Sequence, residues 1–308
     1  MNLIRRIVAA LSVTALSLTA ACGSSADSDN GEITIGLTVS TLNNPYFVQL
    51  IDGAREAAAE LNVKLTVADA QNDAINQINQ MQTFTTQGMR SIIINPVDST
   101  QAAPAAKAAE NASIPLISVD RSIDGGTVTS EIISDNVLGG SLAAIELSRV
   151  TSGAVVHLRG IPGTSASRDR GQGFEKGLSS GTIQVVATQP ADFDRTKGLD
   201  VMTNLPQSHP TLTGVFAEYD ELALGAIKAL GDRAGKDVHV VGFDGTQDAL
   251  SAIEAGTMAA TIAQQPKTLG RAAVEQAVKA AKGDQVQRVI NVEVKVVTRL
   301  NVADFRGG

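Results

Sequence analysis

The feature that most constrains the fold is an alternation of two kinds of segment from Glu32 onward. Short runs rich in β-branched residues are followed by longer stretches in which apolar residues recur at helical spacing. Most of the short runs are apolar almost throughout, which is typical of parallel strands buried on both faces. This alternation predicts an α/β protein built on doubly wound parallel sheets. The candidate strands are 33–39, 63–69, 91–95, 115–119, 154–158, 183–188, 214–218, 238–243 and 259–263.

The alternation is longer than one doubly wound sheet holds comfortably, so we expect two lobes. The first lobe covers about 32–134, and a new helix begins in SDNVLGG, where Asp135 or Asn136 can cap it. No Pro- or Ser-rich linker separates the two halves, which indicates several short crossovers between the lobes. The clearest helical pattern begins at Pro45 and continues through Phe47, Leu50, Ile51, Ala54 and Ala58.

The first 21 residues have the layout of a secretory signal peptide. Arg5 and Arg6 precede an apolar run over 7–18, and small residues follow. The only cysteine, Cys22, comes next, in a pattern that resembles a bacterial lipoprotein processing site. Thr19 stands where such sites usually carry leucine, and a plain signal peptide with an incidental cysteine is the alternative. We expect Cys22 to be lipidated and 22–31 to form a polar, flexible tether.

Composition excludes several classes of function. The chain has 308 residues, a net charge of -7 and a pI of about 5.0, and no basic run, so we expect no nucleic-acid partner. The loop 159–167 is Gly-rich but lacks the spacing of a phosphate-binding or dinucleotide-binding motif. His157, His209 and His239 are isolated in the sequence, and no nucleophile motif occurs. We therefore expect no metal, no cofactor and no catalytic residues.

Ligands of open α/β sheets bind outside the carboxyl ends of the strands, so the residues that follow each strand are the candidates. They combine five of the nine aromatic residues with charged and amide side chains. The candidate ligand-binding residues are Asn44, Tyr46, Phe47, Asn95, Asp120, Arg121, Arg170, Phe193, Tyr219, Phe243, Asp244 and Gln264. Arg168 and Asp220 also follow strands, and we interpret Asp220 and Asp135 as helix caps.

This combination suits a sugar, because a sugar ring offers C–H faces to aromatic rings and a rim of hydroxyls to carboxylates and guanidiniums. Taken singly, each residue has an alternative role: Asn44 as a helix N-cap, Phe193 as a core residue, Asp244 as the cap of the next helix. Asp120 and Asp244 could also form the carboxyl pair of a glycosidase. We argue against that pair because the neighbouring arginines should keep both carboxyls ionised.

A series of long motifs occurs in order between about Glu32 and Val297: STLNNPYF, INPVDS, SVDRS, SDNVLGG, GIPGTSASRDRG, QPADFDR, VFAEYDELALGA, VVGFDGT and ATIAQQP. In these motifs the chain resembles periplasmic D-ribose-binding proteins, the ribose branch of the type I solute-binding proteins of ABC importers. The resemblance implies two lobes joined by three crossovers near 135, 264 and 293, which close on the sugar like a hinge. The implied lobes are 32–134 with 265–293, and 135–264 with 294–308.

Carried over position by position, the resemblance implies the ligand-binding set given above, with Arg168 as the arginine that makes no contact with the ligand. Two positions depart from the family pattern. Tyr46 stands where phenylalanine is usual, which keeps the ring face and adds a hydroxyl. Tyr219 stands where ribose-binding members carry asparagine, so the ligand could be another pentose, a furanose-form hexose or a short polyol.

The resemblance and the export signal together imply a monomeric, non-enzymatic receptor. We expect it to be anchored by lipid on the outer face of the cytoplasmic membrane and to deliver a monosaccharide to the permease subunits of an ABC transporter. The membrane would be a partner only through the anchor. A sensory module that reports the bound sugar to a membrane receptor is the alternative.

Overall fold

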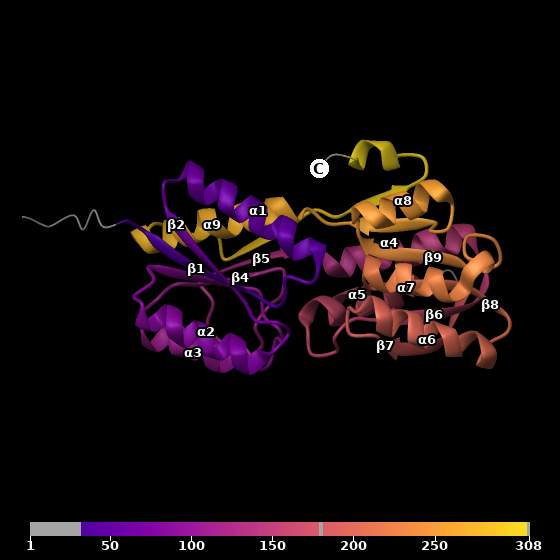
Figure 1. The fold of residues 1–308 in the computed structure, drawn as a ribbon, viewed down its shortest axis with the longest axis horizontal. Coiled ribbons are helices and arrows are strands. Elements are labelled where there is room, and N and C mark those ends of the chain that lie inside the picture. The colour runs from indigo at the N-terminus through magenta and orange to yellow at the C-terminus, as the bar shows by residue number, and fades with distance from the viewer. Residues whose placement is uncertain (1–31, 179–180, 307–308) are drawn as a thin grey trace, which may run out of the picture. The chain divides into compact units, whose positions relative to one another are not determined.

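The computed structural model describes residues 32–178 and 181–306, which form two β-sheets flanked by helices (Figure 1). The signal peptide, Cys22 and the tether lie outside the described residues. The first sheet has the strand order β11-β5-β4-β3-β1-β2, and all its pairs are parallel. Its strands are β1 (Thr34–Val39), β2 (Lys64–Asp69), β3 (Ser91–Ile94), β4 (Leu116–Val119), β5 (Ser130–Ser134) and β11 (Val289–Val292).

The second sheet has the strand order β12-β10-β9-β8-β6-β7. Its strands pair in parallel except at one edge, where β12 runs antiparallel to β10. The strands are β6 (Gly153–Arg159), β7 (Ile183–Pro190), β8 (Leu212–Ala217), β9 (His239–Asp244), β10 (Ala260–Ala263) and β12 (Lys295–Thr298). The predicted class, α/β with two doubly wound and mainly parallel sheets, is therefore confirmed.

Helices cover both faces of each sheet. The first sheet and its helices form the first lobe, and the second sheet and its helices form the second lobe. The helices of the first lobe are α1 (Pro45–Glu60), α2 (Ala74–Thr86), α3 (Ala103–Asn111) and α9 (Pro266–Lys282). Those of the second lobe are α4 (Asn136–Val150), α5 (Ser165–Gly177), α6 (Arg195–Ser208), α7 (Asp220–Leu230) and α8 (Gln247–Ala255), with short 3-10 turns at Gly231–Arg233 and Val302–Phe305. No helix within these described residues is long and apolar enough to cross a bilayer.

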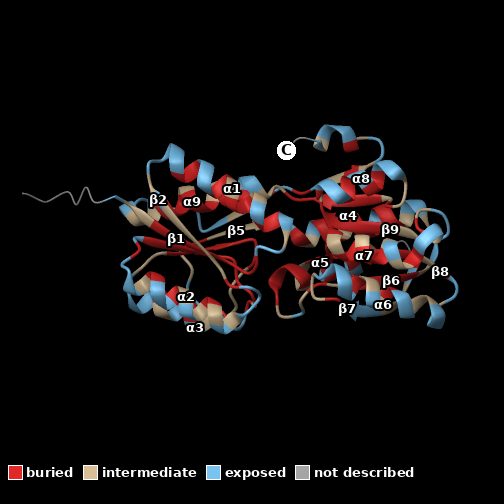
Figure 2. Ribbon diagram, viewed as in Figure 1, coloured by how far each residue is buried: buried red, intermediate tan, exposed pale blue. Residues whose placement is uncertain are grey.

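The apolar runs of the sequence are explained by burial on two faces. In β3, Ile93 packs into the core that α1 and α9 share, whereas Ile92 and Ile94 pack against α2 and α3. Figure 1 shows these two helix pairs on opposite faces of the first sheet, and Figure 2 shows the central strands between them as buried and the edge strand β2 as intermediate. Because successive side chains of a strand point to opposite faces, a strand covered on both sides must be apolar at every position.

The chain passes from one sheet to the other three times: after β5, after β10 and after β11. Asp135 accepts a hydrogen bond from the Leu138 amide at 2.9 Å and caps α4, as predicted. The hinge motion and the lobe boundaries at 134/135, 264/265 and 293/294 stay predictions.

The sequence did not reveal three strands. β5 alternates buried and half-buried residues, and β11 and β12 are four-residue strands at the sheet edges. They lack the continuous apolar run that marks a central strand. The last helix of the first lobe, α9, ends at Lys282, where Gly283 follows in a left-handed conformation with φ of 77°.

Candidate functional site

Ten of the twelve candidate residues line one small pocket at the carboxyl ends of the strands of both lobes. The side chains leave a cavity of about 10 Å³, which is room for about one water molecule. The lining residues are Asn44, Tyr46, Phe47, Asp120, Arg121, Arg170, Phe193, Tyr219, Asp244 and Gln264, with Ala166 as one more. Asn95 and Phe243 lie directly behind this lining.

The first wall of the pocket is the beginning of α1. Asn44 caps the helix, because its Oδ1 accepts a hydrogen bond from the Tyr46 amide at 2.8 Å, and it also lines the pocket. Phe47 belongs to the core of the first lobe and lies 5.4 Å from the Arg121 guanidinium at the pocket. Asn44 and Phe47 therefore each have both of the roles that the sequence left open, a structural role in the first lobe and a place in the lining of the pocket.

The Tyr46 hydroxyl occupies the polar centre of the pocket. It donates a hydrogen bond to Asp120 Oδ1 at 2.8 Å and lies 3.3 Å from Gln264 Oε1. The ring is 4% exposed and packs edge-on against Phe47. Burial and the charge of Asp120 raise the pKa of Tyr46 well above its usual value, so the hydroxyl remains a donor.

Asn95 and Arg121 both contact the Asp120 carboxylate, Asn95 by a hydrogen bond and Arg121 by an ion pair. The Asn95 amide donates to Asp120 Oδ2 at 3.0 Å, and Asn95 Oδ1 accepts from the Ser40 amide at 3.1 Å. Arg121 Nε lies 3.6 Å from Asp120 Oδ2, and Nη1 donates to the Pro96 carbonyl at 2.9 Å. Burial lowers the pKa of Arg121. Asn95 therefore orients a carboxylate of the pocket without lining it.

Arg170 is the central cation of the second lobe. Its Nε donates to Asn136 Oδ1 at 2.9 Å, and its Nη1 donates to the Glu218 carbonyl at 2.7 Å. The guanidinium lies 3.8 Å from the centre of the Phe243 ring and 3.6 Å from Asp244 Oδ1. Phe243 thus supports Arg170 from below, in a cation–π arrangement, rather than lining the pocket.

Asp244 faces Arg170 and Gln264, and Gln264 Nε2 donates a hydrogen bond to Asp244 Oδ1 at 2.6 Å. Asp244 caps no helix, since Thr246 is the N-cap of α8. Burial raises the pKa of Asp244 well above its usual value and outweighs the opposing charge of Arg170, so the arginine does not hold this pKa low as the sequence suggested.

Phe193 and Tyr219 form the apolar wall of the second lobe, with their rings edge-on at 5.9 Å. A side chain at Gly160 would collide with Phe193, because an ideal Cβ there would lie 2.0 Å from the ring. Tyr219 is 2% exposed, and its hydroxyl has no hydrogen-bond partner among the described residues. Burial raises the pKa of Tyr219, so the hydroxyl stays protonated.

Three pocket residues adopt a positive φ, which non-glycine residues rarely do. The values are 67° for Asp120, 56° for Phe193 and 121° for Asp244. Such conformations are costly and cluster at functional sites. This observation supports the pocket independently of its chemistry.

The sequence did not reveal the buried residues that support the pocket through hydrogen bonds without lining it. Glu218 is completely buried: it accepts from the Gly160 amide at 2.8 Å, contacts Ser167 Oγ, and lies 2.9 Å from His157 Nε2. Asn136 was expected only as a possible helix cap. An acidic residue at the end of an otherwise apolar strand was the available signal for Glu218. Asp220 is also not the cap of its own helix, because it bonds to the turn that follows β9.

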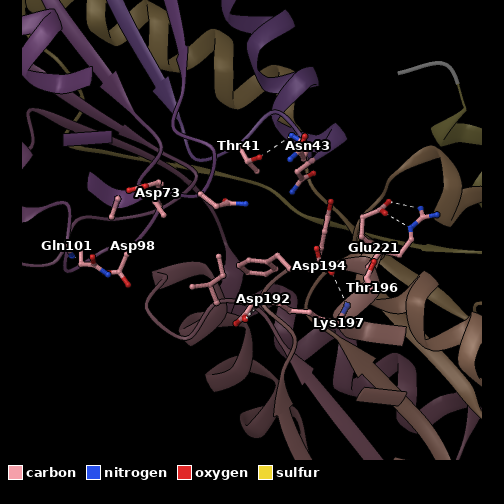
Figure 3. Close-up of a pocket in the computed structure, with 18 of the residues that line it drawn as sticks. Thr41, Asn43, Asp73, Asp98, Gln101, Asp192, Asp194, Thr196, Lys197 and Glu221 are labelled. Atoms are coloured by element: carbon pink, nitrogen blue, oxygen red, sulfur yellow. Dashed lines mark hydrogen bonds and ion pairs between the residues drawn. The ribbon is translucent and has the colours of Figure 1, made fainter. Parts of the chain in front are cut away.

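A larger groove of about 780 Å³ opens beside the pocket and shares Asn44, Phe193 and Tyr219 with it (Figure 3). Its acidic side chains are already engaged. Asp73 and Asp194 cap helices, and Asp192 pairs with Lys197 at 2.7 Å. No cluster of three potential metal ligands occurs in residues 32–178 and 181–306.

A pocket built from the facing strand ends of two doubly wound sheets, with aromatic walls and a charged rim, defines a protein that binds a small polar solute. A model of the periplasmic binding protein domain matches residues 35–285. The ribose import binding protein RbsB of Salmonella typhimurium is 45% identical over 297 residues, which cover 96% of this chain and 99% of that protein. RbsB of Bacillus subtilis is 44% identical over 270 residues, covering 87% and 88%.

A solved structure gives the same fold. An ABC transporter solute binding protein from Bacillus halodurans, with bound myo-inositol, has a TM-score of 0.84 at 32% identity and covers 90% of this chain and 98% of that one. The chain belongs to the RbsB family of periplasmic binding proteins and has their type I fold. These are solute-binding proteins rather than enzymes, which confirms the non-enzymatic prediction.

Proposed function

We propose that this protein is the substrate-binding lipoprotein of an ABC sugar importer, and that it binds D-ribose or a related monosaccharide between its two lobes. The observation that carries the proposal is the convergence of Asp120, Arg121, Arg170 and Asp244 between aromatic faces from both lobes. Relatives that are 45% and 44% identical are ribose import binding proteins, which supports the same ligand class.

The pocket chemistry matches a polyhydroxylated ring. Asp120 and Asp244 can each accept from sugar hydroxyls, while Arg121 and Arg170 can donate to the ring and hydroxyl oxygens. Phe47 and Phe193 supply apolar faces. An analogue that lacks one hydroxyl would leave a buried polar group unpaired, and this gives selectivity.

The size of the cavity supports a movement of the lobes. A pentose has about ten non-hydrogen atoms, and the cavity of about 10 Å³ has room for about one water molecule. We propose that the sugar enters while the lobes are apart and displaces side chains as they close. We propose that the three crossovers are the hinge and that the closed pair of lobes is the form that the permease recognises.

We expect Tyr219 to determine the ligand specificity of the pocket. Its ring lies on the wall between the pocket and the larger groove, with no hydrogen-bond partner for its hydroxyl in the described part of the chain. The asparagine of ribose-binding members would both donate and accept at this place. A sugar or cyclic polyol with a different hydroxyl pattern is therefore the alternative ligand, and one similar structure holds myo-inositol.

A thermal-shift panel of pentoses, hexoses and polyols on the wild type and on Tyr219→Asn tests the proposal. We expect at least one sugar to raise the melting temperature of the wild type and the order of sugars to change in the variant. If no sugar stabilises the wild type, the proposed ligand class is wrong.

The lipid anchor is a separate proposal that rests on Cys22 and the residues before it. Labelled fatty acid should enter the wild type expressed in a bacterial host and should not enter Cys22→Ser. Equal labelling of the two proteins would refute lipidation at this cysteine.

A further inference from the structure

One buried carboxylate beside the pocket has no part in the sugar chemistry described above. Asp220 is 0% exposed and is the first residue of α7, directly after Tyr219. Its Oδ2 accepts hydrogen bonds from the Gly245 and Thr246 amides, both at 2.8 Å, and its Oδ1 accepts from the Thr261 hydroxyl at 2.7 Å. The carboxylate therefore serves a neighbouring turn and not its own helix.

That turn carries Asp244, which lies in the pocket. Asp244 has a φ of 121°, a conformation that L-residues rarely adopt, and Gly245 follows with a φ of 82°. A backbone in this region persists only where the surroundings hold it. Asp220 accepts from both amides that follow Asp244. The Thr261 hydroxyl also accepts from the Gly245 amide, and the Gln264 amide donates to the Asp244 carbonyl, so Asp220 is one of the groups that hold this conformation and the one that binds both amides.

The neighbouring strands leave space for the carboxylate. An ideal Cβ on Gly242 of β9 would lie 2.3 Å from Asp220 Oδ1, and one on Gly245 would lie 2.6 Å from the Ala263 side chain. Glycine at both places lets the carboxylate approach the turn and lets the turn pack against β10. The two glycines of the motif Gly242–Phe243–Asp244–Gly245 thus leave space for the Asp220 carboxylate and for β10, while Asp244 lines the pocket.

We propose that Asp220 is a positioning residue for ligand binding, which fixes the turn after β9 so that the Asp244 carboxylate faces Arg170 and Gln264. This inference rests on the proposed sugar-binding function of the pocket. It assigns Asp220 no contact with the sugar. Loss of Asp220 should weaken binding only through Asp244.

A double-mutant cycle tests this dependence. D-Ribose is titrated calorimetrically into the wild type, Asp220→Ala, Asp244→Asn and the double variant. Asp220→Ala should weaken binding by about ten- to hundredfold, as expected for lost hydrogen bonds to a charged group. In the Asp244→Asn background the same change should cost less than about threefold. An equal factor in both backgrounds would show a general structural role and overturn the proposal.

Two further variants calibrate the cycle. Asp220→Asn keeps one oxygen that can accept from the two amides, so we expect it to recover most of the affinity lost in Asp220→Ala. Asp232→Ala removes an exposed carboxylate of the same lobe and should bind as the wild type does. Failure of Asp220→Asn to bind better than Asp220→Ala would contradict the role of the acceptor oxygens.

Hydrogen exchange without sugar gives a readout that is independent of the ligand. The Gly245 and Thr246 amides should exchange at least about tenfold faster in Asp220→Ala than in Asp232→Ala, while amides of β8 remain protected. Unchanged exchange at these two amides would overturn the proposal even if sugar binding fell. Faster exchange in a protein that binds no sugar would leave the positioning intact and would refute the proposed ligand class instead.

Discussion

The most informative single change is Tyr46→Phe, because it removes one oxygen from the centre of the pocket and keeps the ring. In the structure this hydroxyl donates to Asp120 Oδ1 at 2.8 Å and lies 3.3 Å from Gln264 Oε1. A sugar that binds Asp120 must compete with the tyrosine for the same carboxylate oxygen. The variant should therefore be less stable without sugar and should bind sugar more tightly.

The size of both effects follows from one hydrogen bond. A hydrogen bond to a charged, buried acceptor contributes about 1.5–3 kcal/mol, and a neutral one about 1 kcal/mol. We expect the free energy of unfolding to fall by about 1–2 kcal/mol without sugar. If the wild type must break this bond to admit the sugar, the variant gains about 1 kcal/mol on binding, which is about a fivefold tighter Kd.

Chemical denaturation measures the first effect and titration calorimetry with D-ribose the second. Tyr219→Phe is the matched control for stability, because the Tyr219 hydroxyl has no hydrogen-bond partner among the described residues. Its free energy of unfolding should stay within about 0.5 kcal/mol of the wild type. Binding that is tenfold weaker in Tyr46→Phe would refute the reasoning, because the hydroxyl would then be a contact of the sugar and not its competitor.

Three further predictions concern the ion pair between the lobes, the aromatic wall and pH. Arg168→Ala removes an ion pair in which Arg168 Nη2 lies 2.7 Å from Asp124 Oδ2 of the other lobe, with both side chains about 40% exposed. The variant should bind D-ribose about two- to fivefold more weakly at low salt, and the difference should be smaller at high salt. Calorimetry at two ionic strengths measures both effects. Gly160→Ala places a Cβ against Phe193 and should weaken binding at least tenfold. Gly181→Ala meets no neighbouring atom but strains a backbone with φ of 67°, so it should lower stability and leave binding unchanged. Burial raises the pKa of Asp220 to about 7, so between about pH 4 and pH 7 the folded protein keeps a proton that the unfolded chain has lost. The free energy of unfolding of the wild type, relative to Asp220→Asn, should therefore fall as the pH rises through this window, and a rise measured by denaturation at pH 5 and pH 8 would contradict the assignment.

The central strands and the pocket lining could be predicted because each has a local signature. A strand covered by helices on both faces is apolar at every position, and the residue after it lies at the ligand-binding edge. The edge strands β11 and β12 carry no such signature, since most of their residues are exposed or half-buried. Their place in the two sheets depends on long-range pairing.

The support of the site could not be predicted for the same reason. Asn136, Glu218 and Asp220 act through partners that are 25 or more residues away in the chain. The raised pKa of Asp244 depends on burial, which outweighs the opposing charge of Arg170, a residue that is far away in the chain and is brought close only by the fold. The sequence shows which charged residues are present, but their burial, and with it the desolvation that shifts their pKa values, depends on the fold.

The most direct test of the central claim is a calorimetric titration of D-ribose into the wild type and into Arg170→Ala, with Arg149→Ala as the control for removal of an arginine. Arg170 is buried and bridges Asn136, Glu218 and Phe243 at the pocket, whereas the Arg149 side chain is 67% exposed. The account predicts one binding site per chain in the wild type and in Arg149→Ala, and binding at least about a hundredfold weaker in Arg170→Ala. Equal affinity in Arg170→Ala and the wild type would contradict the claim that the sugar binds in this pocket.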